Sequence, residues 1–198
     1  MFDKSRPEAF SDGVIAVAIT LLALDLAVPG PGHGSLAHLL AHKWPNYAAY
    51  AVSFLTIGII WINHRAMFSR LSSLDHGALV LNVFLLMAIV LLPFTTSLMA
   101  SYLTASDGRL AAAVYGGSFL VMGVAFVGFQ RYLLTPRKQH LLHERMTPEL
   151  CRAVLRRNYI GIAPYAFATA GAVLTPYLTL AICAAVAVYY VMPGTTVD

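Results

Sequence analysis

Charge is the most evident shortage in this sequence, because Asp, Glu, Lys and Arg together make up only 11% of its 198 residues. Soluble domains carry about twice that share. Hydrophobic residues account for 59% of the chain, and they occur in long runs of the kind that cross a lipid bilayer. The composition therefore excludes an ordinary soluble domain and predicts an all-α integral membrane protein.

Cysteine is scarce too, with Cys151 and Cys183 as the only two. Their spacing excludes a zinc site or a disulfide framework, and the pair His140 and His143 is too small a set to predict a metal site. The net charge is only +4, and the basic residues lie between apolar runs, which argues against a nucleic-acid partner. We therefore expect no cofactor and no resident metal ion.

Six apolar runs predict six transmembrane helices within one domain that covers residues 1–198. Each run approaches the ~20 residues that cross the hydrocarbon core of a bilayer. The first run is too long for a signal-peptide core and lacks a clear cleavage site, so we expect it to remain as a span. Prolines 93 and 164 are expected to kink the third and fifth helices. The spans are expected near residues 8–28, 45–68, 77–103, 108–134, 147–174 and 176–193.

Basic residues are distributed unequally between the two sides that these spans define. Eleven fall on the side of the N-terminus, and only Lys43 and Arg109 fall opposite. This bias predicts that the N- and C-termini are cytoplasmic. The longest polar connector, residues 135–157, contains the amphipathic run Leu141-Leu142-His143-Glu144-Arg145, and we expect the connector to lie on the anionic inner leaflet. The eleven are Lys4, Arg6, Arg65, Arg70, Arg131, Arg137, Lys138, Arg145, Arg152, Arg156 and Arg157.

Polar side chains gather at one depth of the first three predicted helices, about one turn inside the cytoplasmic interface. Their donors and acceptors match, so a hydrogen-bonded network that locks the three helices together is one interpretation. An ion-binding or proton-coupling site is the other, since a carboxylate in a membrane helix is a functional candidate by default. The set consists of Arg6, Ser11, Asp12, Trp61, His64 and Asn82.

One face of the first helix carries residues at helical spacing, from Gly13 through Val17, Thr20, Leu21 and Leu24 to Val28. Such a stripe is compatible with a pore lining and equally with a lipid-facing or packing surface. Thr20 is the only hydroxyl in the middle of the span, and its side chain also has the option of bonding back to the preceding turn. Asp25 follows near the outer end, where a carboxylate favours water or a cation.

The opening Arg6, Phe10, Ser11 and Asp12 resembles the signature of the transmembrane protein 175 family, the lysosomal potassium-leak channels and their prokaryotic relatives. The resemblance extends to Trp61-Ile62-Asn63-His64 and to Asn82 with Leu92-Pro93-Phe94-Thr95. Motifs carry the resemblance over the first half of the chain, and the number and topology of the predicted spans carry it over the remainder.

The resemblance implies a potassium-preferring cation channel in the cell membrane. Members with one six-helix unit form homotetramers, in which helix 1 of each subunit lines a central pore. It further implies that Val17, Leu21 and Leu24 form an apolar constriction and that Thr20 is linked to potassium preference. Arg6, Phe10, Ser11, Asp12, Trp61, His64 and Asn82 would hold the pore helices, and Asp25 would lie in the outer vestibule. Permeant K⁺ would then be the only bound ion.

Three other functions stay open. A secondary transporter or proton-conducting protein would use the layer around Asp12 and His64, although two inverted halves are not evident. A membrane enzyme would need a nucleophile and a base, for which Ser11 with His64 is the only candidate pair. A scaffold without transport would need no pore. We expect a channel and not an enzyme.

Overall fold

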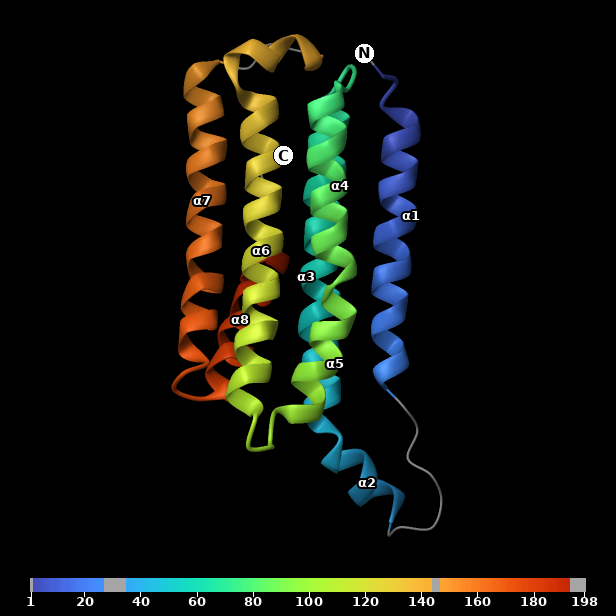
Figure 1. The fold of residues 1–198 in the computed structure, drawn as a ribbon, viewed down its shortest axis with the longest axis vertical. Helices are drawn as coiled ribbons and strands as arrows, with labels where there is room; N and C mark the ends of the chain where they lie inside the picture. The colour runs from blue at the N-terminus through green and yellow to red at the C-terminus, as the bar shows by residue number, and fades with distance from the viewer. Residues whose placement is uncertain (1, 27–34, 144–146, 193–198) are drawn as a thin grey trace.

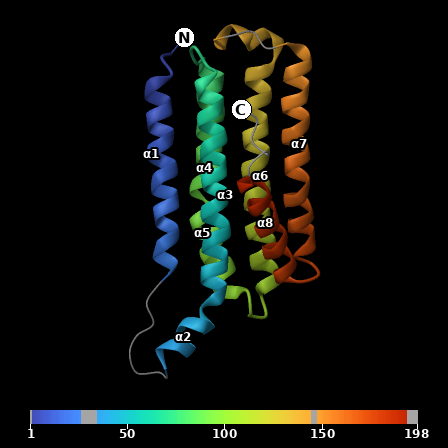
Figure 2. The ribbon, with the colours of Figure 1, turned by 180° about the vertical axis from the view of Figure 1, so that it is seen from behind.

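Long helices of alternating direction pack side by side, with α1 at one edge of the bundle and α7 at the other (Figures 1 and 2). This computed structural model describes residues 2–26, 35–143 and 147–192. We call the end at which α1 begins the basic end. The elements are α1 (Ser5–Leu21), η1 (Leu22–Asp25), α2 (Leu36–His42), α3 (Trp44–Ser69), α4 (His76–Val90), α5 (Leu92–Tyr102), α6 (Gly108–Leu134), η2 (Pro136–Leu141), α7 (Pro148–Gly171) and α8 (Pro176–Val191).

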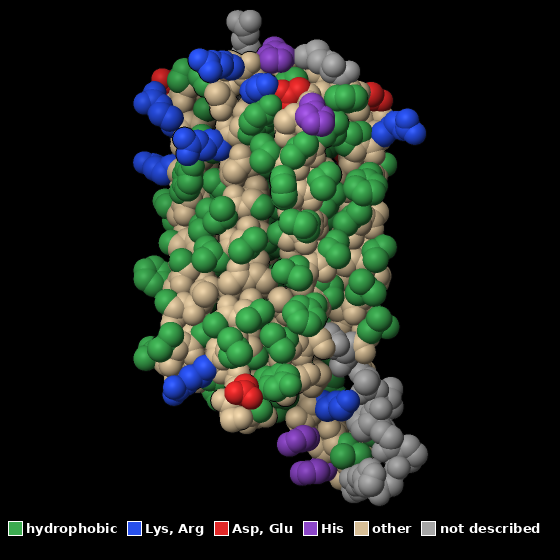
Figure 3. Space-filling model, in the orientation of Figure 1, with side chains coloured by type: hydrophobic (Ala, Val, Ile, Leu, Met, Phe, Trp, Pro, Cys, Tyr) green, Lys and Arg blue, Asp and Glu red, His purple; other side chains and the backbone are tan. Residues whose placement is uncertain are grey.

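Among the residues that the structure describes, four segments are long and apolar enough to cross a bilayer. These segments are α1 with most of η1, then α3, α4 with α5, and α6. Helix α8 is apolar but has only 16 residues, and the 24-residue α7 carries charged residues in its first half. Figure 3 shows green hydrophobic side chains over the middle of the molecule, with most blue and red side chains at its two ends.

Pro93 interrupts the third predicted span, so α4 ends at Val90 and α5 begins at Leu92. Proline has no backbone N–H and clashes with the preceding turn, which explains the break. Thr95 and Thr96 follow the break, and both hydroxyls donate to the carbonyl of Leu92, at 3.1 and 2.7 Å. Pro164, in contrast, lies inside an uninterrupted α7.

The span near residues 108–134 agrees with α6, whereas the short helix α2 had not been predicted. Helix α2 spans seven residues, too few for a periodic hydrophobic pattern to become evident. Its N-cap, Ser35, accepts a hydrogen bond from the backbone N–H of His38 at 3.3 Å. Local capping therefore defines this helix.

The connector after α6 is fastened to the protein at the basic end. Ser72 and His143 donate backbone hydrogen bonds to the carbonyls of Leu141 and Arg70, at 2.7 and 2.9 Å. Leu141 and Leu142 are buried in the hydrophobic core. The two leucines of this amphipathic run therefore pack against the end of the bundle and not against lipid, and the position of the connector at the inner leaflet stays a prediction.

Close packing between α6 and α7 depends on a glycine. A Cβ at Gly116 would lie 3.2 Å from the backbone nitrogen of Thr169, closer than most Cβ contacts. Tyr115, Phe119 and Tyr165 fill the adjacent core, and the rings of Phe119 and Tyr165 stack with centroids 5.7 Å apart. This pair of helices forms the side of the bundle away from α1 (Figure 2).

Candidate functional site

A chain of buried hydrogen bonds joins α1, α4 and α3. The His64 Nε2 lies 2.9 Å from Asn82 Oδ1, and Asn82 Nδ2 donates to Ser11 Oγ at 2.9 Å. Ser11 in turn donates to the carbonyl of Pro7 at 2.8 Å, within its own helix. All three side chains are buried. Since the Asn82 oxygen only accepts, the proton of His64 lies on Nε2.

A second, separate contact holds the Asp12 carboxylate. Trp61 Nε1 donates to Asp12 Oδ1 at 2.9 Å, across α3 and α1. The guanidinium of Arg65 lies over the Trp61 ring, 5.9 Å from its centroid, and the sequence analysis had not included it. Its position four residues after Trp61 on the same helix face was the available signal.

Arg6 and Phe10 do not join this layer. Both side chains are exposed, and Arg6 makes no hydrogen bond or ion pair with another residue of the described part of the chain. Arg6 lies five positions before Ser11, which turns it about 140° around the helix axis. Similar depth therefore did not place these residues on the same face. The single chain thus leaves both residues outside the hydrogen-bonded network, and their role in holding the pore helices stays a prediction.

The opposite face of α1 is open in the single chain. Val17 is 57% exposed, Leu24 is 74% exposed and Leu21 is 40% exposed. The buried side of the same helix consists of Ser11, Ile15 and Ala18 and is continued by Leu22, so α1 contacts its own chain along one face only. Its packing partners are α3, α4, α5 and η1.

Thr20 is exposed on this open face, and its hydroxyl donates to the carbonyl of Val17 at 2.8 Å. The hydroxyl proton is thus used within the helix, which leaves the oxygen lone pairs available to a partner outside it. Asp25 ends η1, but its side chain lies outside the described part of the structure, as does Val28.

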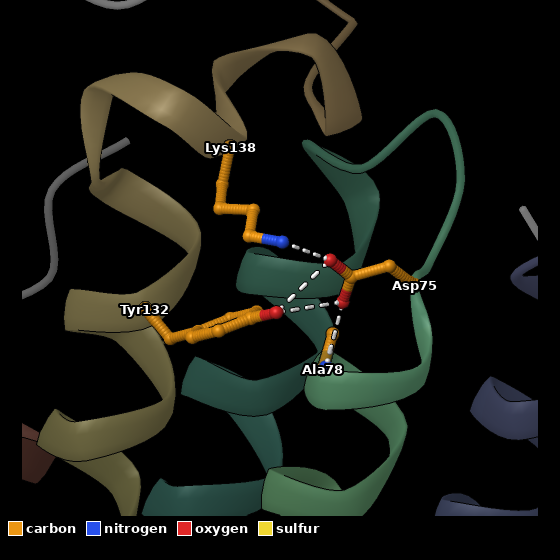
Figure 4. A network of polar contacts seen from close by, with 4 residues as sticks. All are labelled: Asp75, Ala78, Tyr132 and Lys138. Carbon is orange, nitrogen blue, oxygen red and sulfur yellow. Dashed lines mark hydrogen bonds and ion pairs between the residues drawn. The ribbon is translucent and has the colours of Figure 1, made fainter.

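The start of α4, the helix that carries Asn82, is held by a cluster around Asp75 (Figure 4). Asp75 caps α4 by accepting from the Ala78 amide at 2.8 Å, and its carboxylate also accepts from Tyr132 and from Lys138, the latter at 2.6 Å. Partial burial raises the pKa of Asp75, but the hydrogen bonds from Lys138, Ala78 and Tyr132 outweigh it and lower that pKa to about 2. The cluster connects α4 to α6 and η2.

A second buried group of hydroxyls lies between α3, α5 and α6 and was missed by the sequence analysis. Ser53 Oγ lies 2.7 Å from Thr96 Oγ1 and 3.0 Å from Tyr115 Oη. Thr95 and Ser118 form a second pair at 2.9 Å. The signal was the presence of hydroxyls in the middle of three apolar spans, since buried polar groups need partners.

Comparisons with known proteins all find ion channels, most of them named potassium channels and one a proton channel. The family described as "Endosomal/lysosomal potassium channel TMEM175" matches residues 6–93. A protein of Streptomyces collinus named a potassium channel is 41% identical over 96% of this chain and 92% of its own length. The TMEM175 protein of Gallus gallus, named an endosomal/lysosomal proton channel, is 37% identical over 73% of this chain and 29% of its own length. The crystal structure of a lysosomal potassium-selective channel TMEM175 homologue from Chamaesiphon minutus superimposes with a TM-score of 0.83 and 34% identity, covering 94% of this chain and 95% of that one.

Proposed function

Since the chain belongs to the TMEM175 family, we propose that it is a passive, potassium-preferring cation channel in a prokaryotic cell membrane. The bacterial relative named a potassium channel aligns over nearly the whole of this chain, which supports the same activity here. Permeant K⁺ would be its only bound ion, without a cofactor.

The functional unit we propose is a homotetramer of subunits with six transmembrane helices each and both termini in the cytoplasm. Four copies of α1 would surround the central axis. The position of α1 at the edge of the bundle supports this arrangement, because an edge helix with one unpacked face is available to a neighbouring subunit (Figure 1). Helices α7 and α8 would supply the two spans beyond the four that are longest and most apolar.

In this tetramer, Val17, Leu21 and Leu24 form the constriction. Val17 and Leu24 lie seven residues apart on the outward face of α1, so the apolar collar is about 10 Å long at 1.5 Å per residue. A ring of such side chains excludes water, and a hydrated cation then meets a barrier until the ring widens. The outward exposure of these apolar side chains, on a helix held firmly at its back, is the observation that carries the proposal.

Thr20 supplies the oxygen atoms beside this collar. Because each Thr20 proton is donated to Val17, four hydroxyl oxygens would present lone pairs toward a partly dehydrated cation. The ion that loses its water at lower cost, K⁺, gains more from this site than Na⁺. Asp25 would attract cations at the outer vestibule, as acidic rings do in cation channels.

The inner polar contacts support a structural role for Asp12 and His64. Asp12 accepts from Trp61, and His64 bonds to Asn82, so both side chains fasten neighbouring helices. Ser11 donates to Pro7 and accepts from Asn82, and it does not pair with His64 as a nucleophile would pair with its base. These partners favour a channel over a proton-coupled transporter or an enzyme.

Flux measurements on protein reconstituted in liposomes test the proposal. Wild-type protein is expected to pass K⁺ faster than Na⁺ and at rates above transporter turnover, and Leu24→Ala is expected to raise the K⁺ leak because the collar widens. Leu110→Ala is the matched control, since Leu110 is 68% exposed on α6, at the same end of the bundle as Leu24. Equal flux in wild type and Leu24→Ala, with tetramers intact by chromatography, would contradict the assignment of the collar.

A further inference from the structure

An open groove of about 580 Å³ runs along α7 at the basic end of the bundle. Its lining residues are spaced three and four positions apart, so they share one face of the helix. Arg152 and Arg156 lie nearest the start of α7, whereas Ile160 and Ala163 lie about one to three turns further along the helix. The full lining consists of Arg152, Leu155, Arg156, Tyr159, Ile160 and Ala163. The groove thus has a cationic end and an apolar end.

Positive charge at the cationic end comes from two helices. Arg131, in the last turn of α6, donates through Nη1 to the Tyr159 hydroxyl at 3.2 Å. Arg152 pairs with Glu149 at 3.1 Å on the exposed surface, and Arg156 makes no ion pair with any residue that the structure describes. In the described part of the chain, three guanidinium groups, those of Arg131, Arg152 and Arg156, and only one carboxylate, that of Glu149, therefore belong to this cationic end. Figure 3 shows Lys and Arg side chains gathered at this corner of the molecule.

Tyr159 links the two ends of the groove. Its oxygen accepts from Arg131, so its own proton remains available to an acceptor in the groove. Tyrosine side chains also favour the level of lipid headgroups, where the ring is buried and the hydroxyl is hydrated. The order along α7 is therefore charge, aromatic ring and then apolar wall, which is the order met on passing from the headgroups into the hydrocarbon.

The position of the groove leaves it open to lipid. Helix α7 packs on α6 and α8 and lies at the edge of the bundle farthest from α1 (Figures 1 and 2). An assembly that brings α1 helices together therefore keeps α7 on its periphery. The groove itself belongs to the single chain and does not depend on how the copies assemble.

We propose that this groove binds one anionic phospholipid of the inner leaflet. The phosphate lies between Arg152 and Arg156 and accepts from the Tyr159 hydroxyl, and one acyl chain covers Ile160 and Ala163. A guanidinium group matches phosphate oxygens with two parallel hydrogen bonds, which favours arginine for this role. A soluble phosphate would leave the apolar wall uncovered, so the shape and the charge together favour an intact lipid.

Native mass spectrometry of the detergent-purified protein tests this proposal, with phosphatidylglycerol and phosphatidylcholine of the same acyl chains as probes. Wild type is expected to retain phosphatidylglycerol preferentially. Arg156→Gln is expected to weaken that binding about fivefold and Arg152→Gln with Arg156→Gln about thirtyfold, as removal of one and two charges near an anionic headgroup implies. Arg109→Gln, an exposed arginine at the opposite end of α6, is the matched control and is expected to change nothing.

A second variant separates the lipid from a free anion. Ala163→Trp fills the apolar end without changing charge, and it is expected to weaken phosphatidylglycerol binding as well. Equal retention of the two lipids, or equal binding by wild type and the double arginine variant, would overturn the proposal. Displacement of phosphatidylglycerol by an equal concentration of glycerol 3-phosphate would also overturn it, because the groove would then bind a soluble anion and not a lipid. Because the readout is bound mass and not ion flux, its outcome is independent of the proposed channel activity.

Discussion

Replacement of Asn82 should loosen α1 most, because this side chain makes hydrogen bonds to two neighbouring helices. Its amide donates to Ser11 on α1, and its carbonyl oxygen accepts from His64 on α3. Asn82→Leu keeps the branched shape of the side chain and removes both hydrogen bonds. The His64 Nε2–H then remains buried without an acceptor, whereas Ser11 keeps its bond to Pro7.

The expected loss of stability follows from these contacts. Interhelical hydrogen bonds in membrane proteins contribute about 0.6 kcal/mol each, so the two bonds together account for roughly 1 kcal/mol. The orphaned imidazole N–H costs about 1–3 kcal/mol more, because a buried donor loses its partner. The free energy of unfolding should therefore fall by about 2–4 kcal/mol, and the orphaned donor should account for most of it.

Equilibrium unfolding in mixed dodecyl sulfate and maltoside micelles measures this change. Asn63→Leu is the matched control, because its amide donates only to the Ile59 carbonyl one turn earlier, at 3.0 Å. Adding His64→Phe to Asn82→Leu removes the orphaned donor, so the double variant should be more stable than Asn82→Leu alone. Asn82→Leu and Asn63→Leu with equal effects would refute the argument.

Two further variants probe the proposed pore and the basic end. Thr20→Val keeps the shape of the side chain and removes its oxygen, so the K⁺-to-Na⁺ flux ratio should fall toward one while total cation flux persists. Lys138→Met should lower the free energy of unfolding by about 1 kcal/mol at pH 7, since it is one of several groups that hold the Asp75 pKa at about 2. Because the Asp75 pKa is lower in the folded state, its carboxylate stabilises the fold above about pH 4, and this contribution is lost as the pH falls through 2. The unfolding free energies of wild type and Lys138→Met should therefore converge near pH 2. Arg137→Met is the control.

The level of a residue along the bundle was predictable from the sequence, whereas the face of the helix on which its side chain lies was not. Counting 1.5 Å per residue brought Ser11, His64 and Asn82 to one level, and the structure joins them. The same count admitted Arg6, although five residues of helical rotation turn it to the outer face. An apolar helix has a weak amphipathic signal, so its sequence does not reveal which side faces the protein.

Tertiary contacts explain the other differences. The leucines at 141 and 142 have the pattern of a leaflet-bound helix, but backbone hydrogen bonds to the loop at residues 70–74 draw them into the core. The break at Pro93 was expected as a kink, because proline removes one backbone donor wherever it lies in a helix. Just after the break, Thr96 contacts Ser53, which also contacts Tyr115. This hydroxyl cluster depends on which helices are neighbours, and the number of spans does not reveal that.

The contacts of α1 are unequal along its length, and this bears on where the proposed pore is able to widen. Within residues 2–24, every hydrogen bond from α1 to another helix lies at or before Asp12. Beyond that point the buried side of α1 and η1 consists of Ile15, Ala18 and Leu22, which belong to the hydrophobic core. Widening at Leu24 would slide apolar surfaces over one another, whereas the same shift at Ser11 would break buried hydrogen bonds. Within each subunit, the half of α1 beyond Asp12 is thus the half that moves at lower cost, and the proposed collar lies there, while the polar layer fixes the base of the helix.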